Sequence, residues 1–303
     1  MKAFVLSLEL GAGVPLTSQL LYSAGSTDDT RQALMHIVHR FPDAPLLGLS
    51  FSLGANVLTR YVAEEGDRCL LRSACVLACP WDMKFNGDRL NAAILGRHLW
   101  SKGMGRNMQA LIKQHKDILL SNPDSPTYKV TRRVLSMRNP ALNELDNVFT
   151  AVIGGTSPPF PFEDAASYYT WASSHKCLDK IRIPFLTINA SDDPVVKQVP
   201  EECSNGLVVL GLTQGGGHLG WFQSDDSFDV RWTTKPLLEW LRMSGDYLLG
   251  DHERMKSSLY VADDGFLRDA KNPRLGCKVL EVKENSLIDG NAGQQQVFRG
   301  QFL

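Results

Sequence analysis

Residues that can act together in acyl transfer lie just past three apolar runs of this chain. They are Ser52, the pair Asp192 and Asp193, and His218, which follow the runs at 45–51, 183–190 and 206–213. A serine hydroxyl becomes a good nucleophile when a histidine takes its proton, and a carboxylate orients that histidine and stabilises its charged form. The sequence therefore predicts nucleophilic catalysis by a serine, an aspartate and a histidine. At this stage either aspartate could fill the acidic position.

Two serines compete for the nucleophile position in the stretch "LLGLSFSLGAN" (46–56). A nucleophilic serine on a sharp strand-to-helix turn needs small residues two positions before and after it. Ser52 has Ser50 before it and Gly54 after it, and it comes directly after the apolar run, whereas Ser50 lies inside the run. Ser52 is the better candidate, although a serine in place of the usual glycine at position 50 should crowd the turn.

The apolar runs that carry these residues predict a parallel sheet. Five short, nearly continuous apolar segments are typical of strands buried on both faces, at 3–8, 45–51, 72–79, 183–190 and 206–213. Amphipathic helical patterns lie between or after them, at 26–41, 55–66 and 230–245. This alternation predicts a doubly wound α/β fold, in which the carboxyl ends of the strands share one edge and bring the candidate residues together.

About ninety residues interrupt the alternation and are mostly helical in pattern. Helices are expected within 87–120, 126–137, 141–149 and 162–174, with a Pro/Gly-rich break at 154–164. We expect this insertion, 83–174, to form a helical cap, or else further scaffold. Its apolar side chains could line an acyl pocket or form a buried helix seam, and the seam is favoured: Leu90, Ile94, Leu95, Leu99, Trp100, Met104 and Met108.

Composition excludes several classes of function. The net charge of -1 gives no electrostatic reason to expect nucleic acid or an anionic membrane surface as a partner. The six cysteines show no metal-ligand spacing, so we expect reduced thiols, with Cys75 and Cys79 in the core. No G-x-G-x-x-G follows the first apolar run, and no cofactor or metal is expected. No run approaches the roughly 18 apolar residues of a transmembrane helix, and no signal peptide is evident. The residues after 245 are polar and aperiodic, so the tail 246–303 is expected to be poorly ordered.

Four segments together resemble one branch of the α/β-hydrolase superfamily. They read "FSLGANVLTRYVAEEG", "ACPWD", "NASDDPV" and "GGGHLGWF". The branch includes the yeast medium-chain fatty-acid ethyl ester synthase/esterases with bacterial and mammalian hydrolases. The resemblance implies Ser52 as nucleophile, His218 as base and Asp193 of the "DDP" pair as the acid, although position at the strand end would also accept Asp192. The backbone N–H of Leu53 would supply one oxyanion donor.

The resemblance implies a serine esterase, lipase or acyltransferase that acts on medium-chain acyl esters or lipids. Water or an alcohol acceptor would resolve the acyl-enzyme. A location in the cytoplasm, or peripheral to a membrane or lipid droplet, is expected.

The resemblance also implies strands that this sequence does not show. The fold normally has eight strands, of which about five are found, and no "HG" loop precedes the serine. We therefore expect residues 1–245 to form a truncated α/β-hydrolase domain with half of its oxyanion hole, and losing one such donor costs about 100- to 1,000-fold in turnover. The alternative function is a catalytically weak or inactive hydrolase-fold protein that binds a lipid or a protein partner.

Overall fold

The structure, a computed structural model, describes residues 16, 18–223, 231–247 and 258–278. The chain forms two compact units. The sheet unit comprises the described residues of 24–100 and 169–277, and the helical unit comprises those of 16–23 and 101–168 together with Lys278.

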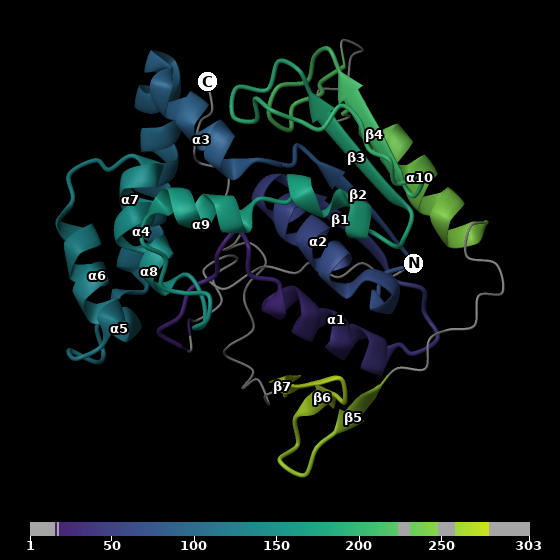
Figure 1. The fold of residues 1–303 in the computed structure, drawn as a ribbon, viewed down its shortest axis with the longest axis horizontal. Coiled ribbons are helices and arrows are strands. Elements are labelled where there is room, and N and C mark those ends of the chain that lie inside the picture. The colour runs from purple at the N-terminus through teal and green to yellow at the C-terminus, as the bar shows by residue number, and fades with distance from the viewer. Residues whose placement is uncertain (1–15, 17, 224–230, 248–257, 279–303) are drawn as a thin grey trace. The chain divides into compact units, whose positions relative to one another are not determined.

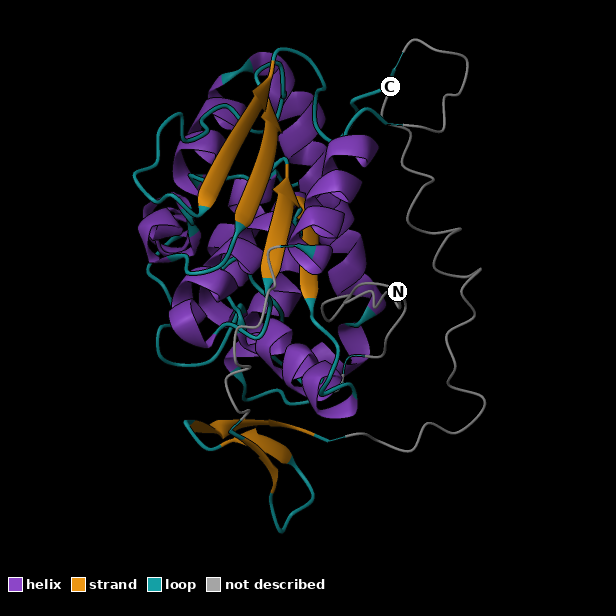
Figure 2. Ribbon diagram, turned by 90° about the vertical axis from the view of Figure 1, so that its right-hand side faces the viewer, coloured by secondary structure: helices purple, strands orange, loops and turns teal. Residues whose placement is uncertain are grey.

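The sheet unit holds four parallel strands in the described part of the chain (Figure 2). They are β1 (Leu47–Phe51), β2 (Ser73–Leu77), β3 (Phe185–Ala190) and β4 (Val208–Thr213), and they pair in chain order. Four of the five expected strands are confirmed, and the fifth, 3–8, lies outside the described residues. Because all four run in the same direction, their carboxyl ends meet at one edge.

Helices cover both faces of this sheet, and β2 shows how its residues divide between them. Ala74 and Val76 pack in one cluster with α2 (Ser52–Glu65), whereas Cys75 and Leu77 pack in another with α10 (Thr234–Asp246). Successive side chains of a strand point to opposite faces, so α2 and α10 lie on opposite sides of the sheet (Figure 1). All five residues of β2 are buried, as expected for a strand in the middle of an α/β sheet.

The helix α1 (Asp28–Arg40) is tied to α2 by ion pairs. Arg31 lies 2.7 Å from Asp28 on its own helix and 2.6 Å from Glu65 on α2, and the Thr27 hydroxyl donates to Glu64 at 2.6 Å. The three helices α1, α2 and α10 confirm the helical patterns expected at 26–41, 55–66 and 230–245. The remaining short elements are η1 (Gly66–Arg68), α3 (Met83–Ala92), the π-helix η2 (Gly96–Ser101), α9 (Ala165–Ala172) and η3 (His175–Lys180).

Residues 259–277 correct the expectation of a poorly ordered tail. They form an antiparallel sheet of β5 (Leu259–Val261), β6 (Leu267–Asp269) and β7 (Asn272–Cys277), which contacts α1. The first hairpin turns at Asp264-Gly265, where Gly265 has φ 78°. Strands this short and polar give little periodicity, but Asp-Gly between two apolar pairs is a hairpin signal that could have revealed them. Residues 248–257 and 279–303 lie outside the described residues.

The helical unit has a core of its own. Its described helices are α4 (Lys102–Gln114), α5 (Lys116–Leu119), α6 (Pro126–Ser136), α7 (Leu142–Val148) and α8 (Thr150–Ile153). Their apolar side chains meet in one cluster whose centre has no exposed surface: Ile112, Leu119, Val134, Leu145 and Phe149. Helices are thus found within the expected segments 87–120, 126–137 and 141–149. Of the expected insertion 83–174, residues 101–168 belong to this unit. In the described part of the chain, no helix is both long and apolar enough to cross a bilayer.

Three apolar residues of the insertion form neither the buried helix seam nor the acyl pocket expected of them. Leu90 is buried, but Ile94, Leu95 and Leu99 are 79%, 76% and 52% exposed. The helical period breaks here because α3 ends at Ala92 and Ala93 is extended, with ψ 131°. These three side chains therefore line neither a buried seam nor an acyl pocket.

The cysteines agree with the expected reduced thiols. All six lie among the described residues and are free. Cys75 and Cys79 have no exposed surface, and burial raises the pKa of each thiol to about 12. These two thiols are core residues and unsuited to nucleophilic chemistry.

Two glycines of α4 give a matched test of packing in the helical unit. A Cβ on Gly105 would lie 2.2 Å from the carbonyl oxygen of Pro140, whereas nothing lies within 4 Å of a Cβ on Gly103. We expect Gly105→Ala to lower the free energy of unfolding by about 1 to 3 kcal/mol. Gly103→Ala should leave it unchanged or raise it by up to about 1 kcal/mol, because alanine favours helix. Urea unfolding of both variants measures the difference, and equal effects would contradict this packing.

Candidate active site

Ser52 stands at a sharp turn from strand to helix. β1 ends at Phe51 and α2 begins at Ser52 itself, which has φ 48°. A non-glycine residue in the left-handed region is uncommon and is typical of functional sites. Ser50, the competing serine, lies within β1, as expected. The turn therefore sets Ser52 at the carboxyl edge of the sheet.

Close packing around this turn explains the small residues that flank Ser52. A Cβ on Gly54 would lie 2.7 Å from the Ser50 Oγ. Ser50, which stands where a glycine is usual, therefore crowds the turn with its hydroxyl, as the sequence predicts. Gly54 has no Cβ and leaves room for that hydroxyl.

A continuous chain of hydrogen bonds joins three of the candidate residues. The Ser52 Oγ lies 2.8 Å from the His218 Nε2, and the His218 Nδ1 lies 2.8 Å from the Asp193 Oδ2. An ionised carboxylate can only accept, so Nδ1 carries the proton and Nε2 is left to accept from the serine hydroxyl. This is the arrangement in which a histidine can act as a base toward a serine.

The carboxylate of Asp193 is fully buried and held from its other side. Its Oδ1 accepts from the backbone N–H groups of Val195 at 2.7 Å and Val196 at 2.9 Å. These bonds satisfy a buried charge and fix the direction in which Oδ2 faces His218, whose side chain is 21% exposed. The histidine is therefore oriented from inside the protein and accessible at the serine.

The neighbouring Asp192 contacts the histidine loop through the backbone. Its Oδ1 accepts from the Gly217 N–H at 2.8 Å, and its Oδ2 accepts from the Gly216 N–H at 3.3 Å. The structure thus places Asp193 beside the imidazole and Asp192 beneath the loop that carries it. The resemblance implies Asp193 as the acid, whereas position at the strand end alone leaves both aspartates open, and sequence reasoning missed the contact of Asp192 with the loop.

The glycines before His218 are required by the shape of their loop. Gly216 and Gly217 have φ 147° and 54°, and a Cβ on Gly216 would lie 2.3 Å from the indole nitrogen of Trp221. That indole donates to the Thr213 Oγ1 at 2.9 Å, at the end of β4. Trp221 therefore clamps the loop to the sheet, a role that the sequence analysis missed although the residue lies in "GGGHLGWF".

Gly216→Ala tests whether this loop positions His218. The added methyl group must displace the Trp221 indole, and alanine is strained at φ 147°. A displacement of about 1 Å at a catalytic base can cost about 100-fold in turnover, and we expect a loss of that size in kcat. Ester hydrolysis measures it, and Gly206→Ala, at a position with nothing within 4 Å, is the control. Unchanged turnover in Gly216→Ala would contradict a positioning role.

Leu53 lies where an oxyanion donor is expected. It is the second residue of α2, and the first N–H groups of a helix have no acceptor within their own helix. The positive end of the helix dipole adds to the attraction for negative charge at this point. The Leu53 N–H can therefore bind a developing oxyanion beside Ser52.

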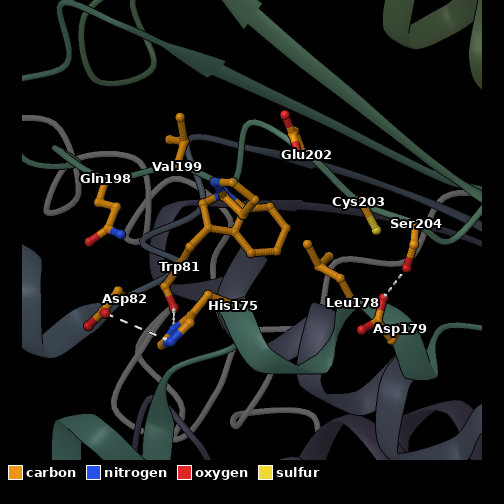
Figure 3. Close-up of a pocket in the computed structure, with 11 residues that line it drawn as sticks. Trp81, Asp82, His175, Leu178, Asp179, Gln198, Val199, Glu202, Cys203 and Ser204 are labelled. Atoms are coloured by element: carbon orange, nitrogen blue, oxygen red, sulfur yellow. Dashed lines mark hydrogen bonds and ion pairs between the residues drawn. The ribbon is translucent and has the colours of Figure 1, made fainter.

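A cavity of about 380 Å³ lies elsewhere in the sheet unit (Figure 3). Its lining has three carboxylates, and among the described residues that form it there is no lysine or arginine: Trp81, Asp82, His175, Leu178, Asp179, Gln198, Val199, Pro200, Glu202, Cys203 and Ser204. The His175 Nδ1 lies 3.2 Å from the Trp81 carbonyl oxygen, and the Ser204 hydroxyl donates to Asp179 at 3.2 Å. An acidic lining of this kind does not suit an acyl chain, and Ser52 and His218 are not among its residues.

Two yeast proteins are among the relatives that comparison with known proteins gives. The chain is 32% identical over 234 residues to "Monoacylglycerol lipase" of Saccharomyces cerevisiae, a match that covers 76% of this chain and 50% of the yeast protein. It is 29% identical over 242 residues to "Medium-chain fatty acid ethyl ester synthase/esterase 2" of the same yeast, covering 74% of this chain and 51% of that protein. The chain thus spans about half the length of these relatives.

Solved structures match the chain at low sequence identity. The crystal structure of Paleococcus ferrophilus monoacylglycerol lipase is 16% identical, with a TM-score of 0.39, and the match covers 73% of this chain and 77% of that one. No family model matches the chain. The relatives are of the branch that the four sequence segments resemble, and the parallel sheet with helices on both faces is the fold that this resemblance implies. The chain belongs to the α/β-hydrolase superfamily.

Proposed function

We propose that this chain hydrolyses carboxylic esters with Ser52 as the nucleophile, His218 as the general base and Asp193 as the residue that orients the base. The observation that carries the proposal is the unbroken hydrogen-bond chain from Ser52 through His218 to the buried Asp193. The names of the relatives support an ester as the substrate class.

In the first half-reaction, the Ser52 Oγ attacks the carbonyl carbon of the ester while its proton passes to the His218 Nε2. The carbonyl oxygen becomes an oxyanion, which the Leu53 N–H binds. The tetrahedral intermediate then expels the alcohol, which leaves with the proton from His218, and the acyl group stays on Ser52. Asp193 stabilises the imidazolium in the interval without taking its proton.

The second half-reaction repeats these steps with an acceptor in place of the alcohol. Water gives up a proton to the His218 Nε2 and attacks the acyl carbon. The second tetrahedral intermediate then collapses as His218 returns that proton to the Ser52 Oγ, which releases the carboxylic acid and the free serine hydroxyl. An alcohol in the same position would give a new ester, which is acyl transfer. Acyl chains of medium length are the proposed substrates, as the yeast ester synthase/esterase suggests by its name.

The test is turnover of p-nitrophenyl esters of short, medium and long acyl chains by the purified chain. We expect hydrolysis with its highest kcat/KM at medium length, and none above background in Ser52→Ala. Added ethanol should divert part of the acyl group into ethyl ester if the acceptor site admits an alcohol. A folded chain that turns over no ester better than Ser52→Ala does would contradict the proposal.

A second candidate is a weak or inactive protein that binds a lipid. The observation that favours it is that Leu53 is the single oxyanion donor identified in the described part of the chain. Saturable binding of a fatty acid together with no turnover would support this candidate over the first.

A further inference from the structure

The outward face of α10 in the sheet unit carries a stripe of exposed side chains. The inward face of this helix packs on the sheet through Leu237, Trp240 and Leu241. Exposed residues recur every three or four positions and so share one side of the helix: Lys235, Leu238, Glu239, Arg242, Met243 and Asp246. These residues are named the α10 stripe below. Leu238 and Met243 are each 40% exposed, although both are large and apolar.

The terminal charges of the α10 stripe oppose the dipole of their own helix. Lys235 is the second residue of α10, and Asp246 is its last. A helix is positive at its amino end and negative at its carboxyl end, so each of these charges lies at the end of like sign. The first turn of α10 has no acidic residue and its last turn has no basic residue that would offset them. The same placement is favourable beside a second helix that runs in the opposite direction.

The charged residues of the α10 stripe form no ion pair within the described part of the structure. Lys235 lies four positions before Glu239 and does not pair with it. Arg242 lies four positions before Asp246, again without an ion pair. Pairs in this order, with the cation nearer the amino end, are the weaker kind within a helix. All of these charges are therefore accessible to a partner.

A second copy of the α10 stripe complements the first. Consider an antiparallel copy of α10 on a two-fold axis that passes between positions 240 and 241. Lys235 then lies level with Asp246 of the second copy, and each of these charges meets the helix end of opposite sign. Glu239 lies level with Arg242 of the second copy, and symmetry forms each ion pair twice. A two-fold interface uses one patch on both copies, so the patch must complement itself in this way.

We propose that this chain forms an antiparallel homodimer through the α10 stripe. The ion pairs set the direction and register of the two helices, and Leu238 and Met243 leave water at the contact. One helix face from each copy makes a small interface, so the dimer is of the weak class whose population rises with protein concentration. The stripe contains no residue of the candidate active site, so the dimer is independent of whether Ser52 is reactive.

The experiment is sedimentation velocity of the full chain over about 1 to 200 µM, a range in which weak complexes form. We expect a dimer that grows with concentration and weakens as salt is raised. Glu239→Arg should lower the association constant by about tenfold or more, because a cation then lies level with Arg242 of the second copy. Arg242→Glu should do the same. The double variant Glu239→Arg with Arg242→Glu restores the pair with its signs exchanged, and its association constant should return to within a few-fold of the original.

A matched control separates the stripe from an effect of net charge. Glu201 is exposed and lies next but one to Val199, which packs in the cluster of α2 on the opposite face of the sheet from α10. Glu201→Arg makes the same change of charge as Glu239→Arg and should leave the dimer unchanged. Circular dichroism checks that each variant is folded. A chain that stays monomeric over the whole range, a dimer that both single variants of the stripe retain, or a double variant that is no better than either single one would overturn the proposal.

Discussion

Ser52→Ala is expected to lower kcat for ester hydrolysis by at least about 10⁴-fold, because no other group in the hydrogen-bond chain can form the acyl-enzyme. What remains would come from substrate binding and the Leu53 N–H alone. The fold should be retained, since serine and alanine tolerate φ 48° about equally. Steady-state hydrolysis of a p-nitrophenyl ester measures the loss, and thermal unfolding of both proteins checks the fold.

Ser50→Ala is the matched control for this change. Ser50 lies two residues earlier, inside β1, and its hydroxyl packs where a Cβ of Gly54 would be. Its removal relieves crowding and should leave kcat within a few-fold of the unchanged chain. A large loss in Ser50→Ala with turnover kept in Ser52→Ala would show that the nucleophile had been misassigned.

Asp193→Asn is expected to lower kcat by about 10⁴-fold with little change in KM. The amide of asparagine can donate to the His218 Nδ1, which favours the tautomer that carries its proton on Nε2. In that tautomer Nε2 cannot accept the proton of Ser52, so the geometry is kept while the base is lost. The test is a comparison of kcat and KM for the same ester in both proteins.

Asp192→Asn is the matched contrast, because position at the strand end alone would accept either aspartate. The carboxylate of Asp192 accepts from two backbone N–H groups of the histidine loop, and the asparagine oxygen can still accept one of them. We expect a loss of about tenfold or less, because the loop is loosened and the base is unchanged. A loss in Asp192→Asn greater than that in Asp193→Asn would assign the two aspartates the other way round.

The sequence predicted most of the sheet and three positions of the candidate site for one physical reason. Strands buried on both faces are continuous apolar runs, and polar residues that follow such runs lie at one edge of a parallel sheet. Ser52 and His218 each follow a run of this kind, and the structure joins them by a hydrogen bond. The position of Leu53 follows directly from that of Ser52.

What the sequence could not predict depends on side-chain direction and backbone conformation. The resemblance implies Asp193, but strand-end position alone does not separate it from Asp192, because a turn decides which carboxylate faces the imidazole. Ile94 and Leu95 fit the pattern of a buried helix, but the extended Ala93 and the bend at Gly96 turn them outward. Local backbone conformation therefore decides which carboxylate faces the imidazole, and it overrides the apolar pattern at Ile94 and Leu95.

The measurement that tests the account most directly is labelling of the folded chain by a fluorophosphonate, with the modified peptide identified by mass spectrometry. A fluorophosphonate reacts with a serine that a base has activated, so labelling reports the nucleophile without assuming a substrate. The account predicts one label, on Ser52, which is retained in Ser50→Ala and absent in Ser52→Ala. A folded chain that takes no label, or takes it on another residue, would contradict it.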